Sequence, residues 1–215
     1  TYMHLRQARI VAFGIISDRD ISIFERLMLY LDYAKRIQKH LDAERDELIA
    51  GVAKRFCGAD YREKLLDRLK SRDEKLHGKR LIKGLRHFFD DFKGMEVINP
   101  DWNIHVARVR QFLDGLADDS GLAAVMKTYH AGSEAFAYEY EQLAMYYVYR
   151  YMLDAVNDYD VLLKAKNAVI GILAVDIMAA ANHASGCTPD FTMRVDIAHL
   201  YSRQFEHSYY NYEVY

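Results

Sequence analysis

Proline is nearly absent from this chain, and its absence constrains the fold more than any other feature of the sequence. Only Pro100 and Pro189 occur among the 215 residues. A proline inside a helix removes a backbone hydrogen bond and clashes with the preceding turn, so a chain with so few prolines can form long helices. The apolar and polar alternation typical of strands is also missing between turn signals. We therefore predict an all-α fold, a bundle of about eight helices.

Apolar residues recur at helical spacing along most of the first half of the chain. A first helix is expected over residues 2–16, and a second begins after Ser22, whose side chain can cap it. A third is predicted over residues 44–56, ending with Gly58 in the left-handed conformation that glycine favours. Residues 60–79 are dense in charged side chains with only a thin apolar line, which indicates a largely solvated helix.

Three longer helices are predicted in the second half. They cover roughly residues 122–156, 161–183 and 188–212, and Thr188 followed by Pro189 is expected to start the last one. The middle helix is apolar nearly all round. A helix of that kind is buried on all sides, so residues 161–183 are predicted to form the centre of the bundle.

Composition favours a single helical domain over residues 1–215 and excludes several kinds of partner. Apolar residues make up 51% of the chain, enough for a substantial core, and the net charge is only −2. Nucleic-acid binders carry a basic excess that is missing here, so no nucleic-acid partner is expected. The longest apolar run, residues 168–175, is too short to cross a bilayer, so no membrane partner is expected either.

The cysteines and the first residue bear on where the protein acts. Cys57 and Cys187 lie far apart in the sequence and lack the spacing of a zinc site, so we expect reduced thiols, no metal site and a cytoplasmic protein. The chain begins at Thr1 without an initiator Met or a signal-like stretch. We therefore expect it to be the C-terminal part of a longer protein.

A tyrosine-rich segment is the first candidate for a functional site. Six tyrosines lie between residues 138 and 151, and Glu139, Tyr146 and Arg150 fall on one helical stripe. A carboxylate, a phenol and a guanidinium on one face can bind a ligand. On spacing alone, an amphipathic core helix whose tyrosine hydroxyls reach the surface is the favoured interpretation.

Asp176 stands in the middle of the apolar helix and is the second candidate. An isolated buried carboxylate is costly, so Asp176 must be protonated or paired, and Arg150 is the first choice of partner. A buried ion pair that fixes helix register explains this residue as well as a substrate-binding role does.

The last helix carries a polar row beside its apolar stripe. The stripe predicted to be buried contains Phe191, Val195, Ala198, Phe205 and Tyr209. The adjoining row contains Asp196, His199, Arg203, Glu206 and Tyr210, and His207 lies one turn beyond Arg203. Arg203, Glu206 and His207 are placed to form one hydrogen-bonded cluster, although a salt-bridged helix flank has the same pattern.

Two other classes of function remain open on these patterns. A non-catalytic helical module that binds a ligand or a protein, as in transcriptional regulators, fits the size but lacks a helix-turn-helix signal. A di-metal carboxylate bundle is suggested by the carboxylate-to-histidine spacing of Glu74 with His77 and of Asp196 with His199. Coincidence explains the first of these pairs better, because it lies in the solvated helix.

Several segments together resemble a known family. The C-terminal run Tyr201-Ser202-Arg203-Gln204-Phe205-Glu206-His207-Ser208, followed by Asn211, is similar to the closing motif of flagellin lysine-N-methylase-like proteins. Residues 146–151 around Arg150 and the apolar stretch 166–180 also look like that family. So do residues 15–41, in which Ser17-Asp18-Arg19 leads into Phe24-Glu25-Arg26-Leu27. The chain thus resembles the C-terminal helical half of the family.

The resemblance implies an enzyme that transfers a methyl group from S-adenosylmethionine to lysine ε-amines of flagellin, with the help of a 4Fe-4S cluster. The family's cluster ligands lie in a cysteine-rich half upstream of the helical one. Since this chain has only two cysteines, no cofactor is expected to bind through its own thiolates, and the fragment alone is expected to be inactive.

Roles for individual residues follow from the same resemblance. Glu206 and His207 are expected to act in catalysis, as bases that help to keep the lysine amine neutral. Substrate or donor binding is expected from residues that combine aromatic faces with charge, because such faces attract a methylated cation. These are Tyr146, Arg150, Asp176, Tyr201 and Arg203.

Overall fold

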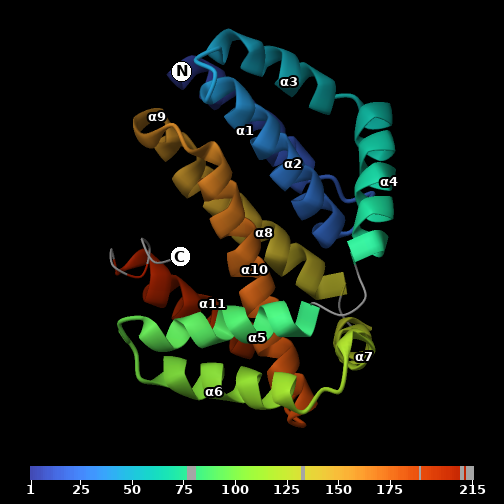
Figure 1. Ribbon diagram of the computed structural model, residues 1–215, viewed down its shortest axis with the longest axis vertical. Helices are drawn as coiled ribbons and strands as arrows, with labels where there is room; N and C mark the ends of the chain where they lie inside the picture. The colour runs from blue at the N-terminus through green and yellow to red at the C-terminus, as the bar shows by residue number, and fades with distance from the viewer. Residues whose placement is uncertain (77–80, 132–133, 189, 209–210, 212–215) are drawn as a thin grey trace. The chain divides into compact units, whose positions relative to one another are not determined.

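The computed structural model describes residues 1–76, 81–131, 134–188, 190–208 and residue 211. In these ranges all regular structure is helical and no strand occurs (Figure 1), which confirms the all-α prediction. There are more helices than the eight predicted. The main reason is that the helix predicted over residues 122–156 is divided into α7 (Asp119–His130) and α8 (Glu134–Tyr151), followed by a short α9 (Ala155–Asp158).

The chain divides into two compact units, each made of two stretches of sequence. The first unit contains residues 1–75 and 134–172, and the second contains residues 76–133 and 173–215. Each unit therefore depends on segments far apart in the sequence. The single domain expected from composition stays a prediction.

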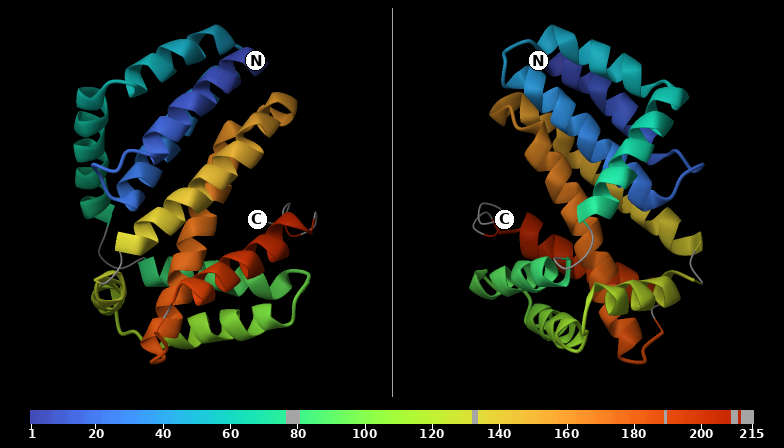
Figure 2. Two further views of the ribbon diagram at one scale, coloured as in Figure 1. Left: turned by 180° about the vertical axis from the view of Figure 1, so that it is seen from behind. Right: turned by 45° about the vertical axis from the view of Figure 1, so that its right-hand side comes forward.

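In the first unit, α1 (Tyr2–Ile16) packs on α2 (Ile23–Leu41), α3 (Ile49–Phe56) and α8. Figures 1 and 2 show α1 and α2 side by side. The predicted start of α2 is confirmed by a capping box. The Ser22 side chain accepts a hydrogen bond from the Glu25 amide at 3.3 Å, and the Glu25 carboxylate accepts one from the Ser22 amide at 2.7 Å. Two backbone donors of the first turn are thereby satisfied.

Buried aromatic residues tie α1, α2 and α3 together. The Tyr33 hydroxyl donates a hydrogen bond to the carbonyl of Ala8 at 3.1 Å, and the Tyr33 ring lies 4.8 Å from that of Phe56. Both rings are buried. Because Tyr33 satisfies its hydroxyl on α1 while its ring packs on α3, one side chain fixes the spacing of three helices.

The predicted helix over residues 44–56 is confirmed only in part. A short 3-10 turn, Asp46–Leu48, precedes α3, and the expected left-handed Gly58 is wrong. The chain leaves α3 through Cys57 in right-handed conformation and passes directly into α4 (Ala59–Leu76), so no reversal is needed at Gly58. Among the described glycines, the left-handed one is Gly186, with a φ of +83°, just after α10.

The second unit contains α5 (Leu81–Asp91), α6 (Asp101–Asp114), α7 and α11 (Phe191–Glu206). Figures 1 and 2 show α5 and α6 side by side. An aromatic cluster joins them to α11. The centre of the Trp102 ring lies 5.2 Å from that of Phe92 and 5.7 Å from that of Phe205, and the Tyr201 ring stacks on Phe205 with a centre-to-centre distance of 4.4 Å. This cluster holds α6 against α11.

The apolar helix predicted over residues 161–183 is α10 (Val161–Ala184). It contributes residues 161–172 to the first unit and 173–184 to the second. Residues 174–182 are all buried, as the apolar pattern predicted, although Leu173 is 41% exposed. No helix among the described residues combines the length and the apolar character that crossing a membrane requires.

The start and the buried face of α11 differ from the prediction. Asp190 caps the helix by accepting a hydrogen bond from the Met193 amide at 2.8 Å, so the cap is not Thr188. Phe191 is exposed and Val195 and Ala198 are only half-buried, because the helix turns a different row of residues inward. Tyr209 and Tyr210 lie outside the described residues. The buried row consists of Arg194, Ile197, Leu200, Tyr201, Gln204 and Phe205.

Candidate functional site

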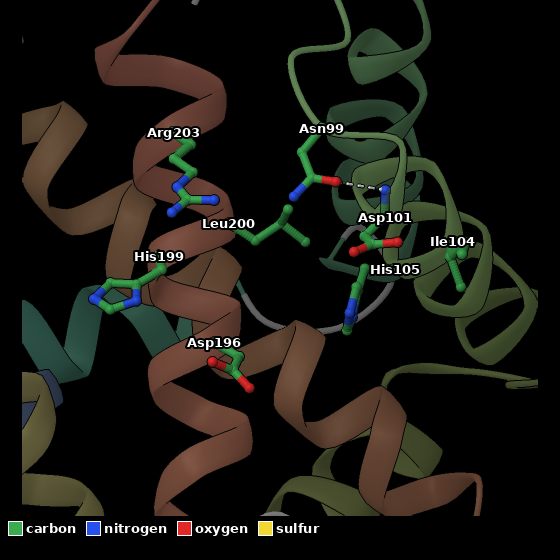
Figure 3. Close-up of a pocket in the computed structure, with 8 residues that line it drawn as sticks. All are labelled: Asn99, Asp101, Ile104, His105, Asp196, His199, Leu200 and Arg203. Atoms are coloured by element: carbon green, nitrogen blue, oxygen red, sulfur yellow. Dashed lines mark hydrogen bonds between the residues drawn. The ribbon is translucent and has the colours of Figure 1, made fainter.

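A cavity of about 360 Å³ lies between α6 and α11 in the second unit (Figure 3). Its walls come from two helices and the segment that leads into α6. The lining residues are Asn99, Asp101, Ile104, His105, Asp196, His199, Leu200 and Arg203. Two carboxylates, two imidazoles and a guanidinium therefore border one space.

The charged groups of this cavity are unpaired. Within the described part of the chain, the side chains of Asp101, Asp196, His199 and Arg203 make no hydrogen bond or ion pair. Charged side chains that face a cavity without a protein partner are available to a ligand.

His105 differs from the other charged or titratable residues of the cavity. Burial lowers its pKa below the usual 6.5, and the positive charge of Arg108 lowers it further, against a smaller opposing effect of Asp101. His105 is therefore a neutral imidazole at pH 7. Its Nδ1 atom is buried and has no hydrogen-bond partner.

Contacts at the start of α6 fix the position of the cavity wall that this helix forms. The Asn99 side-chain oxygen accepts a hydrogen bond from the Asp101 amide at 3.0 Å, as the dashed line in Figure 3 shows. Trp102, the next residue, is fully buried in the aromatic cluster. Asp101 and His105 lie one helical turn apart and line the same cavity.

A polar clamp holds the segment that precedes α6 against the end of α11. Asn211 accepts a hydrogen bond from the Glu96 amide at 2.9 Å and donates one to the Glu96 carbonyl at 2.8 Å. Gln204 donates to the same carbonyl and accepts from the Ile98 amide at 3.2 Å, and Ser208 donates to the Glu96 carboxylate at 2.9 Å. Gln204, Ser208 and Asn211 are all buried, and they give the C-terminal motif a structural role.

The structure places only one of the predicted α11 site residues in the cavity. Arg203 lines it, together with Asp196 and His199 from the predicted polar row. Tyr201 is buried in the aromatic cluster. Glu206 is half-buried and His207 is exposed, at the end of α11. The catalytic roles of Glu206 and His207 stay predictions.

Asp176 is buried, as predicted. It pairs with His130, a residue that the sequence analysis did not single out. The Nε2 atom of His130, at the end of α7, lies 2.9 Å from the Asp176 carboxylate. An ionised carboxylate accepts hydrogen bonds only, so it favours the imidazole tautomer with the proton on Nε2. The pair links α7 to α10 within the second unit.

Arg150, the predicted partner of Asp176, belongs to the first unit. Its side chain is exposed on α8, with the guanidinium 5.8 Å from the centre of the Tyr151 ring. The helix turns this position outward because Tyr147 and Val148 occupy the buried face. A pairing of Arg150 with Asp176 would join the two units and stays a prediction.

The tyrosines of α8 divide between core and surface. Tyr140 and Tyr147 are buried, whereas Tyr138, Tyr146 and Tyr149 are exposed. Tyr146 contacts the rings of Tyr147 and Tyr151 edge-on at 5.6 and 6.4 Å. This division matches the amphipathic helix favoured on spacing, and a binding role for Tyr146 stays a prediction.

Sequence reasoning also missed a buried ion cluster in the first unit. Glu141 on α8 accepts hydrogen bonds from Arg26 at 2.7 Å and from Arg19 at 2.7 and 3.0 Å. The hydrogen bond from Arg19 is the largest cause that lowers the pKa of Glu141 below its usual 4.5, and Arg26 adds to it. Both arginines lie in residues 15–41, which resemble the methylase family. That resemblance was the one signal in the sequence that could have pointed to this cluster.

The fold and cavity define an all-helical protein with a polar site between two helices of its second unit. The family model of the FliB lysine N-methylase C-terminal domain matches residues 9–214. The chain therefore belongs to that family. Neither the curated proteins nor the solved structures contain a match to it.

The residues of this chain do not fit an iron–sulfur cluster. Such clusters are held by four ligands, mostly thiolates. The chain has two cysteines, Cys57 and Cys187, which are exposed free thiols in different units. Among the described residues no group of three or more His, Cys, Asp or Glu side chains is placed to hold a metal ion. The pair Glu74 and His77 lies outside the residues whose side chains are described.

Proposed function

We propose that this chain is the helical part of a longer lysine N-methylase that transfers a methyl group from S-adenosylmethionine to lysine ε-amines of flagellin. The observation that carries the proposal is the match to the lysine N-methylase C-terminal domain over residues 9–214. The longer protein supplies the cysteine-rich half and, with it, any 4Fe-4S cluster. We place the reaction in the cytoplasm.

The cavity of the second unit suits one part of this reaction. A lysine amine attacks a methyl group only in its neutral form, so the enzyme must bind the ammonium ion and remove a proton from it. Asp101 and Asp196 supply negative charge, and the neutral His105 supplies an imidazole. We therefore assign substrate binding to this cavity.

Catalysis needs more than this chain offers. When the amine attacks, the new N–C bond forms as the S–C bond of the sulfonium donor breaks, and the proton passes to a base. We propose Glu206 or His207, near the end of α11, as that base. The chain by itself then binds substrate without turning it over.

The test uses full-length enzyme, S-adenosylmethionine and purified flagellin, with mass spectrometry of the product. Methylated lysines are expected with the unaltered enzyme and are lost or strongly reduced with Glu206→Gln or His207→Gln. Unchanged methylation by both correctly folded variants would leave these residues a structural role. Absence of methylation by the unaltered enzyme would favour the alternative, a non-catalytic binding module.

A further inference from the structure

We propose that the cavity between α6 and α11 binds an unmodified lysine side chain from an extended polypeptide segment, with Asp101 and Asp196 as the ligands of its ammonium group. The inference rests on the proposed function, which makes lysine the substrate. The proposed function already assigns substrate binding to this cavity. The inference adds which group of the substrate enters it, which residues bind that group directly, and the extended form of the polypeptide.

The charges of the cavity favour a cation. Asp101 projects from α6 and Asp196 from α11, so the two carboxylates border the space from opposite walls (Figure 3). The guanidinium of Arg203 is the one permanent positive charge among the described lining side chains. His105 is neutral at pH 7, and His199 is the other imidazole of the lining. Two carboxylates around one ammonium ion provide charge-assisted hydrogen bonds, which are stronger than neutral ones.

A second charged cavity, in the first unit, allows a comparison. It is lined by Asp18, Glu25, Arg62 and Lys70, among others. Here both cations are paired, Arg62 with Asp18 at 3.1 Å and Lys70 with Glu25, while the other lining carboxylates, Asp20, Glu63 and Asp67, form no ion pair among the described residues. The carboxylates between α6 and α11 have no such partner within the described chain. What distinguishes the cavity between α6 and α11 is that all of its lining carboxylates are unpaired in the part of the chain that the structure describes, and that they come from two helices on opposite sides of the space.

The apolar part of the lining fits the stem of a lysine. Leu200 is nearly buried between the polar residues of α11, and Ile104 is 57% exposed on α6. A lysine side chain covers apolar surface with its methylene groups while its ammonium group reaches polar partners. A small inorganic cation would leave these two residues without a role.

The segment that precedes the lining residue Asn99 points to an extended polypeptide. Val97 and Ile98, which lead to Asn99, are exposed apolar residues in a segment without helix. The clamp formed by Gln204 and Asn211 fixes the backbone of this segment. A rigid apolar edge beside a charged cavity binds neighbouring apolar side chains of a substrate at little entropic cost.

The experiment measures binding of a short fluorescent peptide, with one lysine between apolar residues, to the full-length enzyme by anisotropy. The comparison peptide carries acetyl-lysine, which lacks the charge. Asp101→Asn together with Asp196→Asn is expected to weaken binding of the lysine peptide roughly tenfold or more, the effect of losing about 1.4 kcal/mol or more. Binding of the acetylated peptide, weaker from the start, is expected to stay unchanged.

The matched control is Asp91→Asn, an exposed carboxylate of the same unit that does not line the cavity. This variant is expected to bind like the unaltered enzyme, and circular dichroism checks that all variants are folded. Equal affinity of the double variant and the unaltered enzyme for the lysine peptide would overturn the proposal. Equal affinity of the unaltered enzyme for both peptides would overturn it too.

Failure of this inference can be told from failure of the proposed function. If the unaltered enzyme methylates flagellin and the double variant does so with the same KM, the site is wrong and the methylase function stands. If flagellin is not methylated but peptide binding depends on the lysine charge and on both aspartates, the site stands without the reaction. A raised KM with kcat nearly unchanged supports both.

Discussion

Charged groups are arranged in opposite ways in a buried cluster of the first unit and in the cavity of the second. In the first unit, Glu141 and Arg26 have side chains that are 6% and 4% exposed and lie 2.7 Å apart. In the second, Asp101, Asp196 and Arg203 face a cavity and have no partner among the described residues. Buried charges must be paired, whereas charges beside a cavity can remain unpaired and bind a ligand. The first arrangement stabilises the fold, and the second leaves charges available to the ligand that we propose.

Breaking the buried pair should have the largest effect on stability. Arg26→Ala leaves the Glu141 carboxylate buried with one of its two arginines removed, and we expect a loss of about 3 to 5 kcal/mol of unfolding free energy. Arg26 also donates to the carbonyls of Ile16 and Ile21, which become unpaired too. Urea unfolding followed by circular dichroism measures the change.

Arg19→Ala is the matched control, because it removes two hydrogen bonds to the same carboxylate from a side chain that is 65% exposed. Solvent screens such a pair, so the expected loss is below about 1 kcal/mol. Equal losses in Arg26→Ala and Arg19→Ala would show that burial does not decide the strength of this cluster.

The same cluster predicts an acid-sensitive stability. Its arginines lower the pKa of Glu141 in the folded chain below the usual 4.5, so the unfolded chain binds a proton first as the pH falls. The resulting stabilisation is present in full well above pH 4.5 and is lost as the pH falls through the lowered value. Glu141→Gln should therefore lower stability at pH 7 and flatten its decrease below pH 4.5 in urea titrations. An unchanged acid slope would contradict the assignment.

The sequence predicted the helices well because their signals are local. Periodicity located α1 and α10 nearly to the residue, and the capping box at Ser22 needs only a neighbouring Glu25. The break between α7 and α8 was missed although the sequence carries a signal for it, because Gly132 favours the end of a helix and Ser133 favours the start of the next one. Apolar periodicity was given more weight than these two residues.

Partners far apart in the sequence could not be predicted in this way. Arg26 and Glu141 are 115 positions apart, and periodicity does not report which helices meet. The polar row of α11 with Asp196, His199 and Arg203 was predicted, but the α6 side of the cavity was not. Asp101 and His105 look like any surface residues until α11 is placed opposite them.

Removing the clamp beside the cavity should have an intermediate effect. Asn211→Ala leaves the amide of Glu96 without its acceptor and removes one donor from the Glu96 carbonyl, so we expect a loss of about 1 to 3 kcal/mol. Hydrogen exchange at the Glu96 amide should quicken in the same variant. Asn211→Asp keeps an acceptor for that amide and should protect it better. Equal exchange rates in both variants would show that another group holds the segment.

Arg150→Ala tests whether an exposed arginine on α8 behaves like the buried Arg26. The guanidinium lies over the Tyr151 ring at 5.8 Å in an exposed position, where a cation–π contact contributes about 0.5 to 1 kcal/mol. We expect a loss no larger than this in urea unfolding. A loss of about 3 kcal/mol or more would instead show that Arg150 pairs with a buried carboxylate, such as Asp176.

Asp196→Asn should have the smallest effect on stability, because this carboxylate has no partner in the described chain. Surface changes away from a network usually stay within about 0.5 kcal/mol, so the urea midpoint should hardly move. The same variant should nevertheless weaken binding of a lysine peptide, since it removes a charge that the fold does not use. A stability loss comparable to that of Arg26→Ala would mean that Asp196 is part of the scaffold, and the contrast between the two units would then disappear. An unchanged stability with weakened binding would separate the two uses of charge, one for holding helices together and one for recognising a cation.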